Sequence, residues 1–78
     1  MFNSESAPPE MEIQALKEWY KNMQDVIDMN QKMILRLNDS YLDYKEEMIK
    51  ESQNMIKDAQ TIANVLKHNL KEKYNITV

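Results

Sequence analysis

The stretch Leu37-Asn38-Asp39-Ser40-Tyr41 decides the fold, because several signals for the end of one helix and the start of another meet there. Arg36 supplies the positive charge that a helix C-terminus favours, and Asn38 tolerates a left-handed cap. Ser40 with Asp43 resembles a capping box at a helix start. The stretch therefore predicts a turn, although its polar residues could also lie exposed on one continuous helix.

Upstream of this stretch, the sequence has the pattern of a single amphipathic helix. Pro8 and Pro9 suit a helix start, and Glu10 and Glu12 place negative charge in the first turn. Apolar residues then recur at helical spacing and form a stripe about three positions wide in seven. We predict a helix over about 9–37, preceded by a flexible lead-in over 1–8. The expected core or interface positions of this helix are Ile13, Leu16, Trp19, Tyr20, Met23, Ile27, Ile34 and Leu37.

Downstream, apolar pairs recur every seven residues and predict a second helix over about 41–73. Glycine is absent from the whole chain and both prolines lie near its start, so a sheet with tight turns is poorly supported. We predict an all-α hairpin domain over 9–74 and a short tail over 75–78. The expected core or interface positions of the second helix are Tyr41, Met48, Met55, Ile62 and Leu66.

The apolar stripe changes phase between the two halves. Apolar residues recur every seven positions in a series that includes Ile34 and Met48. Before the turn, a second apolar residue precedes members of this series, as Met33 precedes Ile34, whereas after the turn it follows them, as Ile49 follows Met48. A uniform coiled coil keeps its stripe fixed, so the change favours a hairpin, but the slow drift of one long helix would also produce it. One continuous helix in a coiled-coil oligomer is therefore the alternative. A hairpin closed at Asp39 would pair residue 23 with 55 and residue 16 with 62.

The length of the chain predicts self-association. With 78 residues and no cysteine, the protein has a marginal core and no disulfide to reinforce it. A two-helix hairpin has one buried seam and leaves much of a wide apolar stripe in water. We therefore expect a homodimer, most simply a four-helix bundle, that acts as a protein interaction or assembly module. The alternatives are a small regulator that docks a helix on a partner enzyme, and a long coiled-coil spacer.

The sequence offers few residues for catalysis. His68 is the only histidine, and Glu47 with Glu51 could share a cation, but no Glu-x-x-His motif accompanies them. Ser40 has no identifiable triad partners. No phosphate loop, dinucleotide fingerprint, zinc spacing or calcium loop is present. We expect no enzymatic activity, no cofactor and no metal site. Asn30 falls at a core position of the repeat, and we expect it to lie at the edge of the apolar stripe, in contact with water.

Charge and hydropathy narrow the range of partners. The net charge of −3 disfavours sequence-independent attraction to nucleic acid or to anionic lipid. No apolar run approaches the roughly 20 residues that span a bilayer, and the start of the chain lacks the pattern of a secretory leader. We therefore expect a cytoplasmic protein whose partners are a second copy of itself and another protein.

Overall fold

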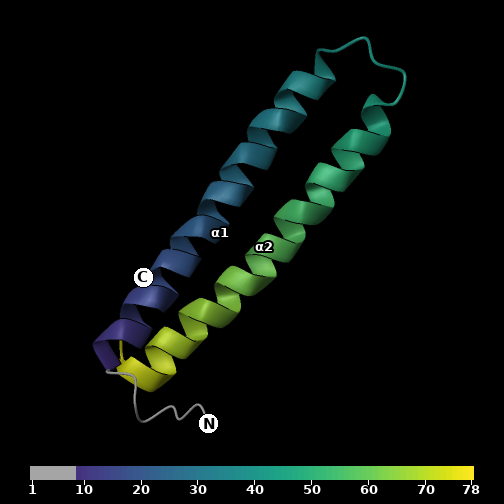
Figure 1. Cartoon of the computed structure of the whole chain (residues 1–78). Helices are drawn as coiled ribbons and strands as arrows, with labels where there is room; N and C mark the ends of the chain where they lie inside the picture. The colour runs from purple at the N-terminus through teal and green to yellow at the C-terminus, as the bar shows by residue number, and fades with distance from the viewer. Residues whose placement is uncertain (1–8) are drawn as a thin grey trace, which may run out of the picture.

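A computed structural model describes residues 9–78 of the chain, and the lead-in expected over 1–8 lies outside the described residues. Two α-helices of 30 residues each, α1 (Pro9–Asn38) and α2 (Lys45–Tyr74), make up the described part. They run antiparallel, with the loop at one end and the start of α1 beside the end of α2 at the other (Figure 1). The predicted all-α hairpin is confirmed, and the continuous helix is not observed.

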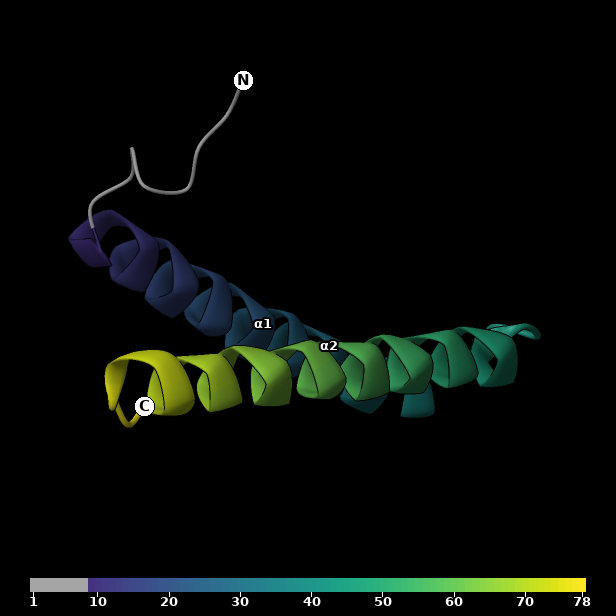
Figure 2. The ribbon, with the colours of Figure 1, turned by 90° about the horizontal axis from the view of Figure 1, so that it is seen from below.

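The two helices pack along their length and cross at an angle rather than lying strictly parallel (Figure 2). Such crossing is expected when a seven-residue apolar repeat is wound on a helix that has 3.6 residues per turn. At 1.5 Å per residue, each helix is about 45 Å long. The hairpin therefore presents two long faces, one on each side of the seam where the helices meet.

The loop is longer than the sequence predicted, and this is a correction. The second helix begins at Lys45 rather than near Tyr41, and Ser40 is not its N-cap: that position belongs to Tyr44, which makes no side-chain cap. Instead, the Ser40 hydroxyl accepts a hydrogen bond from the backbone N–H of Leu42 at 3.3 Å. A serine can bond its own neighbouring backbone as readily as a helix end, and here it stabilises the turn.

The left-handed helix cap also lies elsewhere than expected. Asn75 has φ 57° and is the only non-glycine residue with positive φ in the range 9–78, so Asn38 does not adopt this conformation. At the end of α2, the backbone N–H of Asn75 donates to the carbonyl of Lys71, and that of Ile76 donates to the carbonyl of Leu70. These bonds satisfy carbonyls that the helix end leaves unpaired. The start of the tail expected over 75–78 is therefore part of the helix cap.

The seam between the helices follows alternating spacings of three and four residues on both helices. This spacing keeps the chosen side chains facing the partner helix as in a coiled coil. The most deeply buried apolar residues are Leu37 of α1 and Ala59, Ala63, Leu66 and Leu70 of α2, and Leu70 has no exposed surface. The seam positions are Ile13, Leu16, Tyr20, Met23, Ile27, Asn30, Ile34 and Leu37 on α1, and Ile49, Ser52, Ile56, Ala59, Ala63, Leu66 and Leu70 on α2.

The longer loop changes the register of the hairpin. Closure at Asp39 would have placed residue 66 opposite Glu12, whereas Glu12 bonds to Lys73. Met55 and Ile62, which the expected register would have paired with α1, keep 52% and 45% of their surface exposed. The predicted pairings of residue 23 with 55 and of residue 16 with 62 are therefore wrong, because the extra loop residues bring a different stripe of α2 to the seam.

An ion pair joins the two helices at the open end of the hairpin. Lys73 Nζ donates to Glu12 Oε1 at 2.8 Å, and hydrogen bonds from Lys73 and then Tyr74 hold the pKa of Glu12 below its usual value. A carboxyl group with a lowered pKa stabilises the folded state at pH values above its ordinary pKa, and this contribution is lost as the pH falls. The same bond raises the pKa of Lys73, so the pair is intact from mildly acidic to alkaline pH.

We therefore expect Glu12→Gln to lower the melting temperature slightly at pH 7 and to have less effect as the pH falls below 4.5, the ordinary value of the Glu12 pKa. The effect is small because solvent reaches both side chains of the pair and screens the charges. Circular dichroism melts between pH 3 and pH 8 measure it. Glu10→Gln removes the same charge from the same turn as a control, and an equal response of both variants at every pH would contradict the role of the ion pair.

Candidate self-association face

Apolar doublets repeat along both helices and give the hairpin two kinds of apolar position. In each doublet the second residue enters the seam and the first lies beside it. In α1, for example, Ile34 is half-buried while Met33 keeps 46% of its surface exposed. In α2, Ala63 is buried while Ile62 keeps 45% exposed. The doublets are Trp19-Tyr20, Val26-Ile27 and Met33-Ile34 on α1, and Met48-Ile49, Met55-Ile56 and Ile62-Ala63 on α2.

The first members of these doublets lie on one side of the hairpin. Met33 from α1 and Met48 and Met55 from α2 line the same hollow, so the two flanks face the same way. Residues seven apart stay within about 20° of one another around a helix, which places Trp19 and Ile62 on this side too. We call this side the apolar face. Its residues are Trp19, Val26 and Met33 of α1 and Met48, Met55 and Ile62 of α2.

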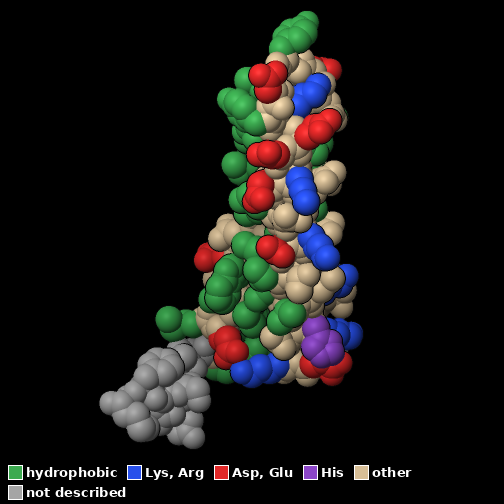
Figure 3. Space-filling view, turned by 90° about the vertical axis from the view of Figure 1, so that its right-hand side faces the viewer, with side chains coloured by type: hydrophobic (Ala, Val, Ile, Leu, Met, Phe, Trp, Pro, Cys, Tyr) green, Lys and Arg blue, Asp and Glu red, His purple; other side chains and the backbone are tan. Residues whose placement is uncertain are grey.

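The other side of the seam is polar. Gln24 of α1 and Gln60 and Asn64 of α2 border a smaller hollow there, over the seam residues Ile27 and Ala63. In a view onto the edge of the hairpin, hydrophobic side chains gather along one margin with Asp and Glu side chains among them, while most Lys and Arg side chains and the His lie toward the other margin (Figure 3). The hairpin is thus amphipathic as a whole, with more exposed apolar side chains on one face than on the other.

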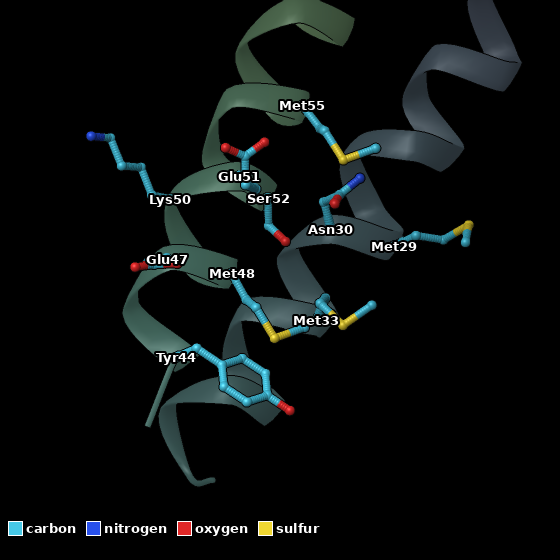
Figure 4. A pocket seen from close by; sticks show the side chains of 10 residues that line it. All are labelled: Met29, Asn30, Met33, Tyr44, Glu47, Met48, Lys50, Glu51, Ser52 and Met55. Atoms are coloured by element: carbon cyan, nitrogen blue, oxygen red, sulfur yellow. The ribbon is translucent and has the colours of Figure 1, made fainter. Parts of the chain in front are cut away.

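A hollow of about 690 Å³ opens on the apolar face near the loop. Methionines from both helices border it: Met48 and Met55 extend from α2 toward α1, whereas Met29 extends away from α2 (Figure 4). Methionine side chains are flexible and polarisable, and therefore adapt to an incoming apolar group. We call this feature the methionine hollow. The hollow is lined by the methionines Met29, Met33, Met48 and Met55, by Asn30 and Ser52 between the helices, and by Tyr44, Glu47, Lys50 and Glu51 on the side of α2.

Two polar side chains lie in the seam beneath the methionine hollow. Asn30 is half-buried, and its Nδ2 donates to the carbonyl of Val26 at 2.8 Å, which leaves its Oδ1 as a hydrogen-bond acceptor. Ser52 keeps only 6% of its surface exposed. Asn30 thus lies at a seam position and lines the hollow, which opens to solvent. A group that filled the hollow could combine apolar contact with one hydrogen bond.

The structure divides the predicted core and interface residues between the seam, the apolar face and the loop. Leu37 and Leu66 are buried in the seam, and the half-buried residues of α1 lie along it. Tyr41 is fully exposed in the loop and contributes to neither surface. The half-buried seam residues are Ile13, Leu16, Tyr20, Met23, Ile27 and Ile34, and the residues on the apolar face are Trp19, Met48, Met55 and Ile62.

Sequence reasoning missed most of the α2 side of the seam. Ser52, Ala59, Ala63 and Leu70 are all buried, yet only Leu66 was expected there. Small residues are weak markers of a core, because alanine and serine also occupy exposed helix positions. The available signal was their spacing, since they continue the series of threes and fours that runs from Ile49 to Leu70.

The candidate chemical groups do not assemble into a site. Nowhere in 9–78 do three or more His, Cys, Asp or Glu side chains lie close enough to hold a metal ion. Glu47 and Glu51 border the methionine hollow, and His68 is exposed on α2. Neither described helix is long and apolar enough to cross a membrane. No family model, curated protein or solved structure matches this chain.

Proposed function

We propose that this protein is a non-enzymatic assembly module, in which two hairpins associate through their apolar faces to form a four-helix bundle. The observation that carries the proposal is the gathering of exposed apolar residues on one face. Trp19, Met55 and Ile62 keep about half of their surface exposed there, while glutamine and asparagine lie on the other face together with the exposed Leu35. A patch of exposed apolar residues is typical of a protein interaction surface.

The small core of one hairpin supports the same proposal. In 9–78 only five apolar residues are buried, and two of them are alanines. A chain of this size usually needs a disulfide, a metal or oligomerisation to reach useful stability. The chain has no cysteine, so association with a second copy supplies the missing burial. A second hairpin is the simplest partner, because its apolar face has the same length and the same composition.

The dimensions of the hairpin set the area that a dimer can bury. The residues of the apolar face span 19–33 on α1 and 48–62 on α2, about 21 Å of each helix, so two helices about 10 Å wide give an apolar area of roughly 420 Å². Stable protein interfaces of standard size bury about 800 Å² on each partner. The apolar residues alone supply about half of that area, so a dimer of standard size also buries the polar residues beyond them along the helices.

Light scattering coupled to size-exclusion chromatography, with small-angle scattering on the same samples, tests the proposal. We expect a particle with twice the chain mass of 9.3 kDa at concentrations near 100 µM, and an elongated bundle about as long as one hairpin. A chain that stays monomeric and helical at this concentration would contradict self-association. The apolar face would then be left for the helix of a different protein, as in the regulator that the sequence also allows.

A second protein partner, an assembly role in the cell and a cytoplasmic location complete the proposal. In a four-helix bundle the apolar faces are consumed by the dimer, so a further protein would have to bind the outer, charged surfaces. These surfaces carry Asp28 paired with Lys32 at 3.1 Å, and other exposed charges of both signs. Recovery of the bundle with a bound partner from the native host would identify that protein.

A further inference from the structure

We infer that Trp19 of each hairpin fills the methionine hollow of the other, in a dimer whose two loops lie at opposite ends. The inference rests on the proposed self-association and adds its orientation and its central contact. It starts from an asymmetry within the apolar face. Toward the loop the face is hollowed between methionines, whereas nearer the open end it carries the only tryptophan of the chain, 56% exposed.

Position along the helices brings the ring and the hollow together. Trp19 lies ten residues after the first residue of α1, and Met29 lies nine residues before its last. Met55 lies ten residues after the first residue of α2, so it is level with Met29 in the same hairpin. When two hairpins overlap fully with opposite directions, α1 lies on α1 and Trp19 of one copy reaches the level of Met29 and Met55 of the other. The two-fold axis repeats this contact, so both hollows are filled.

Shape disfavours the other way of pairing the apolar faces. With both loops at the same end, the two methionine hollows would face each other, and Trp19 would meet the side chains around Ile62 and Val65. Large side chains would then meet large side chains near the open end, and the two methionine hollows would join into one larger void near the loop. Empty space in an interface forfeits dispersion contacts and destabilises it. The opposed arrangement places bulk against hollow twice.

The chemistry of the hollow suits an indole ring. Tryptophan buries about 150–250 Å² when it is enclosed, and its N–H normally finds an acceptor there. Sulfur atoms of methionine make favourable contacts with aromatic rings, and four methionines border the hollow. Asn30 follows Met29 in the sequence, and its Oδ1 is an acceptor for the indole N–H. The hollow thus supplies both apolar contact and a hydrogen-bond partner.

Charge is compatible with the opposed arrangement. The first turn of α1 carries Glu10 and Glu12, and its last turn carries Arg36. The first turn of α2 carries Glu46 and Glu47, and its last turn carries Lys71 and Lys73. When each helix lies on its own copy in reverse, acidic ends meet basic ends. Because the same-end arrangement also matches these charges, shape rather than charge selects between the two.

A single spin label in the loop measures the orientation. The chain has no cysteine, and Tyr41 is fully exposed, so Tyr41→Cys gives one labelling site that contacts neither face. Electron–electron double resonance on the dimer is expected to give a label separation of about 45 Å or more, the length of one helix. A separation of about 20 Å, the width of two helices, would place both loops at one end and overturn the inference.

The indole itself is tested with Trp19→Ala in full-length chain. We expect the dimer dissociation constant to rise at least about thirtyfold, the effect of a central aromatic anchor, while Tyr41→Ala leaves it unchanged. In the unsubstituted protein, the emission of Trp19 should shift to shorter wavelength as the concentration passes through the dissociation constant. Absence of any dimer would overturn the proposed function together with this inference. A dimer that is indifferent to Trp19→Ala would overturn the inference alone.

Discussion

The double substitution of Met55 and Ile62 by lysine is expected to dissociate the dimer. Both side chains lie on the apolar face, about half-exposed in the isolated hairpin, and both would be enclosed against the second copy. A lysine at such a position must either lose its hydration or push the helices apart. Two substitutions of central residues, at about 2 kcal/mol or more each, raise the dissociation constant by about a thousandfold. Analytical ultracentrifugation over a concentration series measures the change.

Gln53→Lys with Gln60→Lys is the matched control for this variant. These glutamines are exposed on the same helix, are also seven residues apart, and lie on the opposite flank of the seam. The control adds the same charge and the same side-chain length to the polar side, and we expect the dissociation constant to change by less than a factor of about five, the scale of an ordinary surface substitution. Equal weakening by both double variants would show that charge, and not the apolar face, governs association.

Much of the fold could be predicted from the sequence because the decisive signals are local and repetitive. Pro9 and the acidic residues after it mark the start of α1, and the seven-residue apolar pattern requires helices. The phase change of the stripe also has a structural meaning. In α1 the series through Ile27 and Ile34 enters the seam, whereas in α2 its continuation through Met48 and Met55 lies on the apolar face. The seven-residue series continues across the loop, but it faces the seam in α1 and the apolar face in α2.

The errors have one physical origin, which is the loop. A capping box at Ser40 and a short turn were reasonable, because serine accepts hydrogen bonds at helix starts. The serine instead bonds within the loop, to Leu42, and α2 begins only at Lys45. Those extra residues rotate and shift α2, so that Ala59 and Ala63 enter the seam and Met55 turns outward. The length of the loop depends on which of several local hydrogen bonds of similar energy form. The periodicity of apolar residues carries no information about these hydrogen bonds.

Leu70→Ala is expected to unfold much of the hairpin at moderate temperature. Leu70 is the only large side chain in 9–78 with no exposed surface, and it lies in the seam near the open end. Replacing a fully buried leucine by alanine costs about 3–5 kcal/mol through lost burial and the cavity that remains. In a domain of this size, 1 kcal/mol lowers the melting temperature by about 4–8 °C. A fall of at least about 12 °C should follow in thermal melts recorded by circular dichroism.

The matched control for Leu70 is Val65→Ala, on the same helix at 56% exposure, for which we expect a much smaller loss of stability than for Leu70→Ala. The two predictions also differ in how they depend on concentration. Leu70 stabilises the seam inside each hairpin, so Leu70→Ala should lower the melting temperature even where the dimer is saturated. The lysine variant of the apolar face should instead remove the rise of melting temperature with concentration, because it weakens a bimolecular contact. If the Leu70→Ala protein regained full stability when its concentration was raised, the seam would depend on contact between chains. The description of the seam as an intramolecular core would then be wrong.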